Sequence, residues 1–410
     1  MLTKANNDRL TRVVGDAPMG GIMRKHVWIP FARAASLHGS TPQKVRLFGE
    51  DFVAFRAEDG RIGFVDERCP HRGVSLALAR VEGCALRCIF HGWKMDASGA
   101  VIEVPTEGAR SAEVAAKVKV NHYPTREAGG MAWVYLGKQD PPPFPKLPFL
   151  EVPPENIWVS RSVVPCNWLQ GLEAALDSSH LGWLHQSWIE GVSSTEAAKF
   201  LVPPVYETER TGYGLRAAAI RDLPDGTSFL RVGEYVLPFT MMNQTDRQPE
   251  TGREYACFIA VPVDDETHLL FWLIWNDSAP LIDVSTFTKN EYDDDNYATF
   301  RGTRDTNWGQ DRAAMDAGHF SGFTENLIAE DVVVQISMGR IADRTREHLG
   351  TTDEAIVKAR LQLLKLVKAF EAGDPVEDIL GAYRTEGALP VAMVVPQGFD
   401  WTRARTEALA

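Results

Sequence analysis

Two short segments near the beginning of the chain carry side chains that bind soft metal ions. Cys69-Pro70-His71 and Cys88-Ile89-Phe90-His91 each supply one thiol and one imidazole, and sixteen residues separate the two segments. Two thiolates and two imidazoles suit either a zinc ion or an iron–sulfur cluster. Zinc fingers usually keep a cysteine pair apart from a histidine pair, so the mixture of one each in both segments favours the cluster.

The residues next to these four side chains predict loops rather than regular elements. Pro70 and Gly73 follow the first ligand, and Gly92 follows the last. Proline removes a backbone donor and glycine adopts turn conformations readily, so neither residue continues a helix or a strand well. We therefore expect both ligand segments to lie at the tips of turns.

With these neighbours the sequence resembles the Rieske family, whose pattern is CxH followed by CxxHGW. The resemblance implies a [2Fe-2S] cluster in which Cys69 and Cys88 hold one iron while His71 and His91 hold the other. A structural zinc site is the alternative reading. An absorption spectrum separates the two, because zinc is colourless and the cluster is red-brown.

Two positions indicate which branch of that family the chain resembles. Rieske proteins of respiratory membrane complexes add one cysteine to each ligand loop and join the two as a disulfide, whereas this chain has Val74 and Phe90 there. The resemblance is therefore to the oxygenase and ferredoxin branch. Cys84 lies near the second loop, and we interpret it as a small buried residue rather than a ligand.

A second group of possible metal ligands follows in the pattern Asp177-x-x-His180-x4-His185. Rieske non-haem oxygenases carry the same pattern at a mononuclear Fe(II), so the resemblance implies that His180 and His185 are iron ligands. Two histidines and one carboxylate on one face of iron leave positions open for dioxygen and substrate. Residues five apart on a straight helix point well away from each other, so the chain must bend between the histidines, most simply at Gly182. The plain alternative is two ordinary residues of an amphipathic helix.

The third iron ligand has several candidates. We predict Asp331, because the stretch from Glu330 to Gly350 resembles the C-terminal signature of phthalate and phenoxybenzoate dioxygenases, in which such an aspartate ligates iron. A block of like charge is usually a solvated loop, so the acidic run of residues 293–295 is a weaker candidate. The other competing carboxylates are those of Asp311, Glu330 and Asp343.

Asp177 lies three residues before a predicted ligand, on nearly the same helical face. A carboxylate there can accept the proton of the ligating imidazole and fix its orientation. The resemblance further implies that Asp177 relays electrons from the Rieske cluster of the next subunit. Cooperating centres on different chains require head-to-tail contacts, which close as a ring, and the family's arrangement is a homotrimer.

The chain has no GxGxxG after a predicted strand, so we expect no nicotinamide- or flavin-binding segment in it. Electrons are expected from a separate reductase with flavin (FMN) and a ferredoxin-type cluster, fed by NADH. The remaining partners are dioxygen and a small aromatic substrate.

Composition sets wider bounds. Hydrophobic residues make up 44% of the 410 residues and charged ones 24%, which is ordinary for a water-soluble protein. A net charge of −12 argues against binding to nucleic acid. No apolar run reaches membrane-spanning length, the start lacks a signal peptide, and five cysteines fit a reducing compartment. We expect a cytoplasmic protein without membrane contact.

The predicted fold is α+β, with two domains. Residues 1–150 read as an antiparallel β Rieske domain, in which short alternating runs are bounded by turn signals. Seven prolines between residues 141 and 154 predict a stiff connector. Residues 151–410 are expected to form the catalytic domain, a central antiparallel sheet (strands within 204–276) flanked by helices near 167–186, 321–338 and 353–372. The expected strands of the first domain are 45–48, 52–56, 62–66, 92–95, 101–104 and 131–136.

The predicted function is that of the oxygenase component, the catalytic alpha subunit, of a Rieske oxygenase. It hydroxylates or dihydroxylates an aromatic carboxylate such as a phthalate or phenoxybenzoate; the alternative is a monooxygenase that removes O- or N-methyl groups. Pocket walls are expected from residues 204–243 and 268–276, with Arg216 and Arg231 as candidates for binding a carboxylate. Exposed strand arginines are an equally good reading of these two. A bare electron carrier would leave some 260 residues after the proline connector unexplained.

Overall fold

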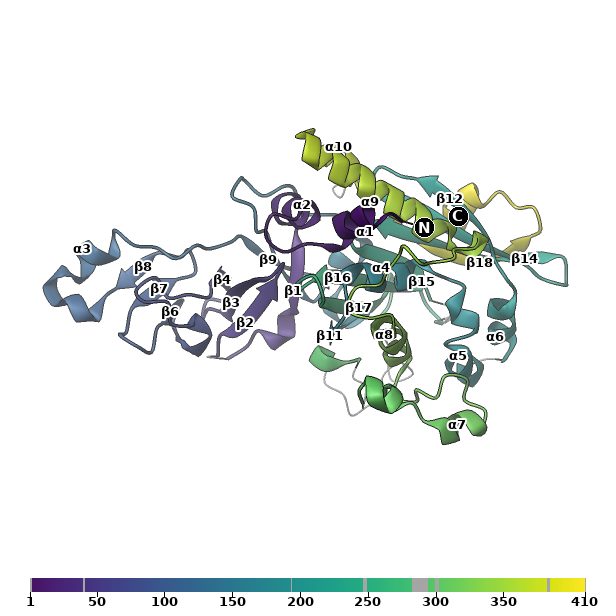
Figure 1. The fold of residues 1–410 in the computed structure, drawn as a ribbon, viewed down its shortest axis with the longest axis horizontal. Helices are drawn as coiled ribbons and strands as arrows, with labels where there is room; N and C mark the ends of the chain where they lie inside the picture. Colours follow the sequence, from purple (N-terminus) through teal and green to yellow (C-terminus); the bar gives the residue numbers. More distant parts are fainter. Residues whose placement is uncertain are drawn as a thin grey trace. The chain divides into compact units, whose positions relative to one another are not determined.

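The computed structural model describes residues 2–39, 41–192, 194–245, 249–281, 294–298, 302–381 and 384–409. The chain folds into two compact units (Figure 1). The smaller unit is Val13–Pro143, and the larger unit combines Met1–Arg12 with Phe144–Ala410. The units therefore divide seven residues before the expected border at 150, within the proline-rich connector, and the first twelve residues belong to the larger unit.

The smaller unit is built from three small antiparallel sheets, with strand orders β1-β10-β9, β2-β3-β4 and β5-β6-β7-β8. All six strands predicted for this part of the chain are present. Its two helices are α2 (Pro18–His26) and α3 (Ser111–Ala115). The strands are β1 (Ile29–Arg33), β2 (Gln43–Leu47), β3 (Glu50–Arg56), β4 (Ile62–Asp66), β5 (Arg80–Glu82), β6 (Ala85–Arg87), β7 (Lys94–Asp96), β8 (Val101–Glu103), β9 (Thr125–Ala128) and β10 (Met131–Val134).

The core of the smaller unit reaches the predicted metal loops. Val53, Phe55 and Leu86 pack in one buried cluster with Cys69 and Cys88. Alternate strand residues point to one face, so β3 and β6 direct these apolar side chains toward a shared interior. The two cysteines are thus held by the packing of the unit itself, as expected for loops that lack a disulfide.

The larger unit is organised around an eight-stranded antiparallel sheet. Seven of its strands follow the order β11-β17-β16-β15-β14-β13-β12, and the eighth, β18, pairs with β14 outside this order. The long strand β14 pairs with β15 near its end and with β18 along its earlier residues. All nine residues of β17 are buried, so this strand is covered on both faces. The strands are β11 (Ile157–Val164), β12 (Val205–Arg210), β13 (Gly214–Asp222), β14 (Thr227–Val236), β15 (Thr240–Gln244), β16 (Glu254–Pro262), β17 (His268–Asn276) and β18 (Val391–Pro396).

Helices flank this sheet, and the predicted α+β class is confirmed. Helix α4 packs on β15, β16 and β17 and against α8, while α9 packs on β12 and β13. The helices predicted near 321–338 and 353–372 correspond to α8 and α9. The helices are α1 (Lys4–Thr11), α4 (Trp168–Leu176), α5 (Gln186–Val192), α6 (Ser194–Leu201), α7 (Arg312–Asp316), α8 (Leu327–Ser337), α9 (Glu354–Ala372), α10 (Glu377–Leu380) and α11 (Ala404–Leu409). No helix in the described part of the chain is both long and apolar enough to cross a membrane.

A buried ion network fixes helix α4, whose end leads into the second group of predicted ligands. Glu173 on α4 pairs with Arg344 (2.8 Å) and with Arg360 of α9 (2.6 Å), and Arg360 also pairs with Glu347. Burial alone would raise the pKa of Glu173, but the two guanidinium groups outweigh it and lower that pKa. The segment that resembles the dioxygenase signature therefore has a structural task in this chain, because Arg344 and Glu347 hold α4 in place.

Candidate metal centres

The predicted break between His180 and His185 is present, but the helix expected near residues 167–186 already ends before His180. Helix α4 stops at Leu176, Asp177 caps it in an extended conformation, and His180–Gly182 form a single tight turn before α5 begins. Gly182 is buried, and a Cβ there would lie 2.3 Å from the backbone oxygen of Phe200. Glycine at this position therefore allows the close approach that brings both histidines to one place.

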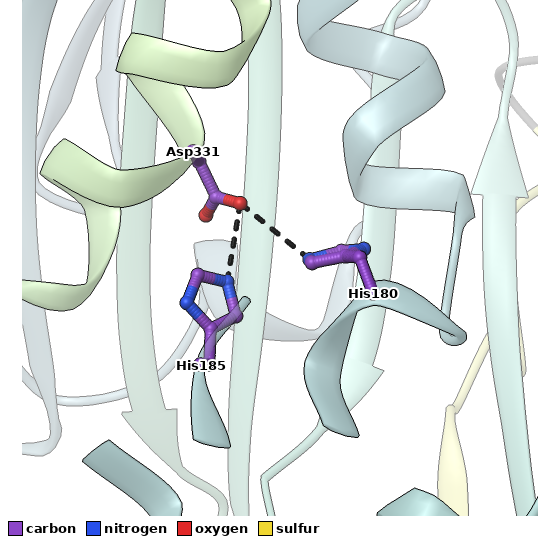
Figure 2. Close-up of side chains that lie close together, drawn as sticks. All are labelled: His180, His185 and Asp331. Atoms are coloured by element: carbon purple, nitrogen blue, oxygen red, sulfur yellow. Dashed lines mark hydrogen bonds and ion pairs between the residues drawn. The ribbon is translucent and has the colours of Figure 1, made fainter. Parts of the chain in front are cut away.

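His180, His185 and Asp331 lie together (Figure 2). One ligand atom from each residue lies within 4.8 Å of the other two. Asp331 Oδ1 is 3.1 Å from His185 Nε2 and 3.5 Å from His180 Nε2. Two atoms that share a metal ion at about 2.1 Å, at right angles, lie about 3 Å apart, so the three atoms fit one ion. Helix α8 supplies Asp331, 146 residues after His185.

Each histidine contacts a further carboxylate through its Nδ1. Glu330 Oε2 lies 2.6 Å from His185 Nδ1, and both side chains are almost completely buried. Asp177 Oδ2 lies 3.5 Å from His180 Nδ1, and these two side chains are 25% and 23% exposed. No spacing pattern in the chain predicts the contact between Glu330 and His185, because it depends on how α8 lies against the turn before α5.

The charges of this group depend on one another. Burial disfavours the charged imidazolium of His185, yet Asp331 and Glu330 together raise its pKa to about 10. Burial would raise the pKa of Asp331, but His185 and His180 lower it below its usual range. Burial raises the pKa of Glu330 in spite of its bonds with His185 and Ser321. A cation placed among these carboxylates would take over the role of the imidazolium charge.

The three residues open into a cavity of about 170 Å³ in the larger unit. Both stretches predicted as pocket walls contribute to it, together with α4, α8 and the segment around His185. Most of the lining is apolar, and includes Leu181, Trp188, Ile189, Phe258, Leu270 and Trp272. Besides His180, His185 and Asp331, the polar side chains on the wall are few: Asp177, Arg231, Asn243, Thr245 and Gln335. The cavity thus has the form of a small-molecule site, apolar with a few polar groups.

The two predicted arginines lie in different surroundings. Arg231 on β14 lines the cavity, and its Nη1 lies 3.4 Å from Ser178 Oγ. Arg216 on β13 does not line it; its guanidinium lies beside Glu234 (3.4 Å) and Glu209 (3.1 Å). The structure thus brings only one of the two predicted arginines to the cavity.

The other carboxylates considered as iron ligands lie outside the group. Asp311 is exposed and caps α7 by accepting the Ala314 N–H, and Asp343 is exposed and accepts from Thr345. Of the acidic run 293–295, residue 293 lies outside the described residues. Asp295 pairs with Arg161, and Asp294 accepts from Trp158.

The loop that carries Cys69 and the loop that carries Cys88, both in the smaller unit, have the same hydrogen-bond pattern. In the first, the Cys69 N–H donates to the Val74 oxygen and the Gly73 N–H donates to the Cys69 oxygen. In the second, the Cys88 N–H donates to the backbone oxygen of Trp93, and the Gly92 N–H donates to the backbone oxygen of Cys88. Gly73 and Gly92 have φ values of +76° and +72°, a left-handed conformation that favours glycine. The predicted turns therefore hold the two cysteines in matching positions.

The four predicted cluster ligands meet between these loops. The rings of His71 and His91 lie 4.6 Å apart, and His71 stacks on Trp93. Cys69 and Cys88 are both 3% exposed, and burial next to Cys88 raises the pKa of Cys69 to about 11. His91 Nδ1 is buried without a hydrogen-bond partner in the described part of the chain. A buried imidazole nitrogen with no partner is costly unless it binds a metal, so these residues fit the cluster.

Cys84 is only partly buried, whereas the sequence suggested a buried residue. It carries a free thiol and packs against the core of the smaller unit. Phe90, at the position where respiratory Rieske proteins have a cysteine, is 52% exposed, with the guanidinium of Arg72 over its ring.

Two thiols and two imidazoles at paired loops, together with a separate site of two histidines and one carboxylate beside an apolar cavity, define an iron-dependent oxygenase. The family models agree: residues 27–124 match the Rieske [2Fe-2S] domain, and residues 134–409 match the model described as LigXa C-terminal domain like. The chain belongs to the Rieske non-haem iron oxygenases, as an oxygenase subunit of the phthalate dioxygenase branch. Its cofactors are a [2Fe-2S] cluster and a mononuclear iron.

Named relatives lead to the same family, and a solved structure shows the same fold. The chain is 37% identical to the phthalate 4,5-dioxygenase oxygenase subunit of Pseudomonas putida, over 98% of this chain and 94% of the relative. It is 31% identical to the 5,5'-dehydrodivanillate O-demethylase oxygenase subunit of a Sphingobium species, over 96% and 87%. The terminal oxygenase of carbazole 1,9a-dioxygenase from Nocardioides aromaticivorans shares the fold, with a TM-score of 0.60, 20% identity, and coverage of 90% and 98%. The chain is thus the O2-using component of a system that needs a separate electron donor.

Proposed function

We propose that His180, His185 and Asp331 hold the mononuclear iron, and that the cluster is held by Cys69, His71, Cys88 and His91. The observation that carries the first assignment is the convergence of two imidazoles and one carboxylate within 4.8 Å, at the wall of an apolar cavity. When bound, the cluster supplies single electrons and the mononuclear iron activates dioxygen.

The residues around the site determine how a substrate is held. The apolar wall formed by side chains such as Phe258 and Trp272 accepts an aromatic ring and excludes water. Arg231 offers a planar cation to a carboxylate at this wall. Gln335, one helical turn after Asp331, also lines the cavity, and its buried Oε1 has no hydrogen-bond partner in the described part of the chain. A substrate donor would satisfy that oxygen.

The substrate we propose is an aromatic carboxylate, and the reaction is hydroxylation or cis-dihydroxylation. Arg231 and the phthalate named in the dioxygenase relative support this class. Demethylation of an aromatic acid is the second candidate, favoured by the relative named as an O-demethylase. Arg216 is not part of the proposal, because Glu234 and Glu209 surround it away from the cavity.

Asp177 is proposed to relay electrons between subunits. Its Oδ2 lies 3.5 Å from His180 Nδ1, and a quarter of the side chain remains exposed, which supports a role next to the proposed iron ligand. This role requires chains arranged head to tail in a closed ring. We propose that the ring is a homotrimer, the arrangement that the family resemblance implies. The electron donor we propose is a reductase that carries FMN and a ferredoxin-type cluster and oxidises NADH.

The test is oxygen uptake by the oxygenase with such a reductase and a panel of aromatic acids, followed by product mass. A gain of two oxygens and two hydrogens identifies dihydroxylation, and a gain of one oxygen identifies hydroxylation. Loss of a methyl group as formaldehyde identifies demethylation. Reductase-dependent uptake that no aromatic acid stimulates, while non-carboxylate aromatics do, would refute the substrate class.

A further inference from the structure

Two consecutive carboxylates of helix α8 contact opposite sides of one imidazole. Glu330 Oε2 lies 2.6 Å from His185 Nδ1, while Asp331 Oδ1 lies 3.1 Å from Nε2 of the same ring. The two ring nitrogens point away from each other, so Glu330 cannot bind an ion that His185 Nε2 and Asp331 share. A carboxylate that competed as a ligand on sequence grounds therefore has a different position in the structure.

The second oxygen of Glu330 is also occupied. Ser321 Oγ donates to Glu330 Oε1, and the backbone N–H of Phe323 donates to Ser321 Oγ at 3.1 Å. Ser321 is 7% exposed and Glu330 is fully buried. With both oxygens in hydrogen bonds, the carboxylate cannot rotate away from His185 without breaking one of them.

The loop that carries Ser321 and the start of α8 are themselves fixed. The N–H of Phe320 donates to Ser187 Oγ, two residues after His185. Asn326 caps α8 by accepting the Ala329 N–H, and its amide donates to the Tyr297 oxygen. Glu330 lies in the first turn of α8, where the helix dipole stabilises negative charge.

We propose that Glu330, held by Ser321, is the positioning residue for His185. It accepts a hydrogen bond from Nδ1–H, so that, when a metal is bound, the Nε2 lone pair faces the space next to Asp331. Histidine ligands of metals commonly donate their second ring N–H to a carboxylate, and removal of that partner typically weakens metal binding 10- to 100-fold. The inference rests on the proposed mononuclear site and adds a residue that prepares it.

The pair on the other histidine is the natural control. Asp177 lies 3.5 Å from His180 Nδ1, beyond good hydrogen-bond distance, and both side chains are about a quarter exposed. If metal affinity depends on short contacts between buried side chains, then the loss of the Glu330 carboxylate should weaken metal binding, and the loss of the Asp177 carboxylate should not.

The experiment is a metal titration of the full chain. The mononuclear metal is removed with a chelator under conditions that leave the cluster absorbance unchanged, and Fe(II), or Co(II) as a coloured probe, is titrated back. For Glu330→Gln we expect a Kd raised 10- to 100-fold and an altered Co(II) spectrum. Ser321→Ala should raise Kd a few-fold, and Asp177→Asn should leave both readouts near the wild-type values.

The outcomes separate this inference from the proposed site. A wild-type Kd and Co(II) spectrum in Glu330→Gln would overturn the role of Glu330 and leave the site intact. Wild-type protein that takes up no metal at all would instead refute the site. If Glu330→Gln loses the cluster spectrum or its thermal unfolding transition, the variant is misfolded and Ser321→Ala becomes the test. A folded Ser321→Ala variant with an unchanged Kd would also contradict the proposal.

Discussion

The two histidines of the proposed mononuclear site contact the same oxygen of Asp331 but lie in very different surroundings. His185 is 1% exposed and lies 2.6 Å from a fully buried glutamate, whereas His180 is 23% exposed and lies 3.5 Å from a partly exposed aspartate. We call these the closed half and the open half of the site. We propose that the two halves share the metal but differ in task, with the closed half fixing one ligand firmly and the open half lying on the proposed path of the electrons.

The two halves also have different origins in the chain. The open half, Asp177 and His180, comes from neighbouring residues at the end of α4, so one local turn forms it. The closed half joins His185 to helix α8, 145 residues further on. Long-range packing therefore forms the closed half, whereas a local turn with partly buried side chains forms the open half.

The largest effect that sharpens this comparison is expected at Asp177. Asp177→Asn keeps the size of the side chain but removes its charge, so electron delivery should fail while both metal centres remain bound. We expect turnover to fall by about 100-fold or more, with unchanged iron content and cluster spectrum. Normal turnover with the physiological donor would show that the open half carries no electrons.

Arg231, which lines the cavity and is not among the proposed metal ligands, is expected to act on the substrate alone. Arg231→Gln should raise KM for aromatic carboxylates about 10- to 100-fold, because a charge-assisted hydrogen bond contributes about 1.5–3 kcal/mol. Steady-state oxygen uptake measures this. Arg216→Gln is the matched control on the other face of the sheet, and an equal rise in KM there would argue against a specific role for Arg231.

The bend that joins the two halves depends on Gly182. A Cβ at this position would meet the backbone of Phe200, so Gly182→Ala should lower the free energy of unfolding by about 1–3 kcal/mol. Denaturant unfolding and iron content report the effect. Gly191→Ala, in a helix with open space around the glycine, is the control and should change stability little.

The smallest effect is expected at the other metal centre. Cys84→Ala removes a thiol that packs against the core but that we do not assign to the cluster. The visible absorption and EPR spectra of the cluster should be unchanged, whereas a lost or shifted spectrum would make Cys84 a ligand after all.

Local motifs allowed much of this to be predicted from the sequence. The cluster loops depend on residues within five positions of each cysteine, and the bend before His185 follows from helix geometry and one glycine. The contact between Glu330 and His185 depends on the orientation of α8, which no local pattern contains.

The arginines show the same limit. Arg216 lies opposite Glu234 in the pairing of β13 with β14, and Arg231 lies three residues before Glu234. Side chains an odd number of residues apart in a strand point to opposite faces, so the two arginines face different sides of the sheet. Strand pairing had to be known before one of them could be assigned to the cavity.

Metal analysis of the wild-type chain and of Asp331→Ala tests the central claim most directly. Asp331 lies close to both histidines, so its loss should release the mononuclear iron and leave the cluster in place. We expect about three irons per wild-type chain, two in the cluster and one at the mononuclear site, and about two in the variant with an unchanged Rieske spectrum. Three irons retained in Asp331→Ala, or zinc in place of iron in the wild type, would contradict the account.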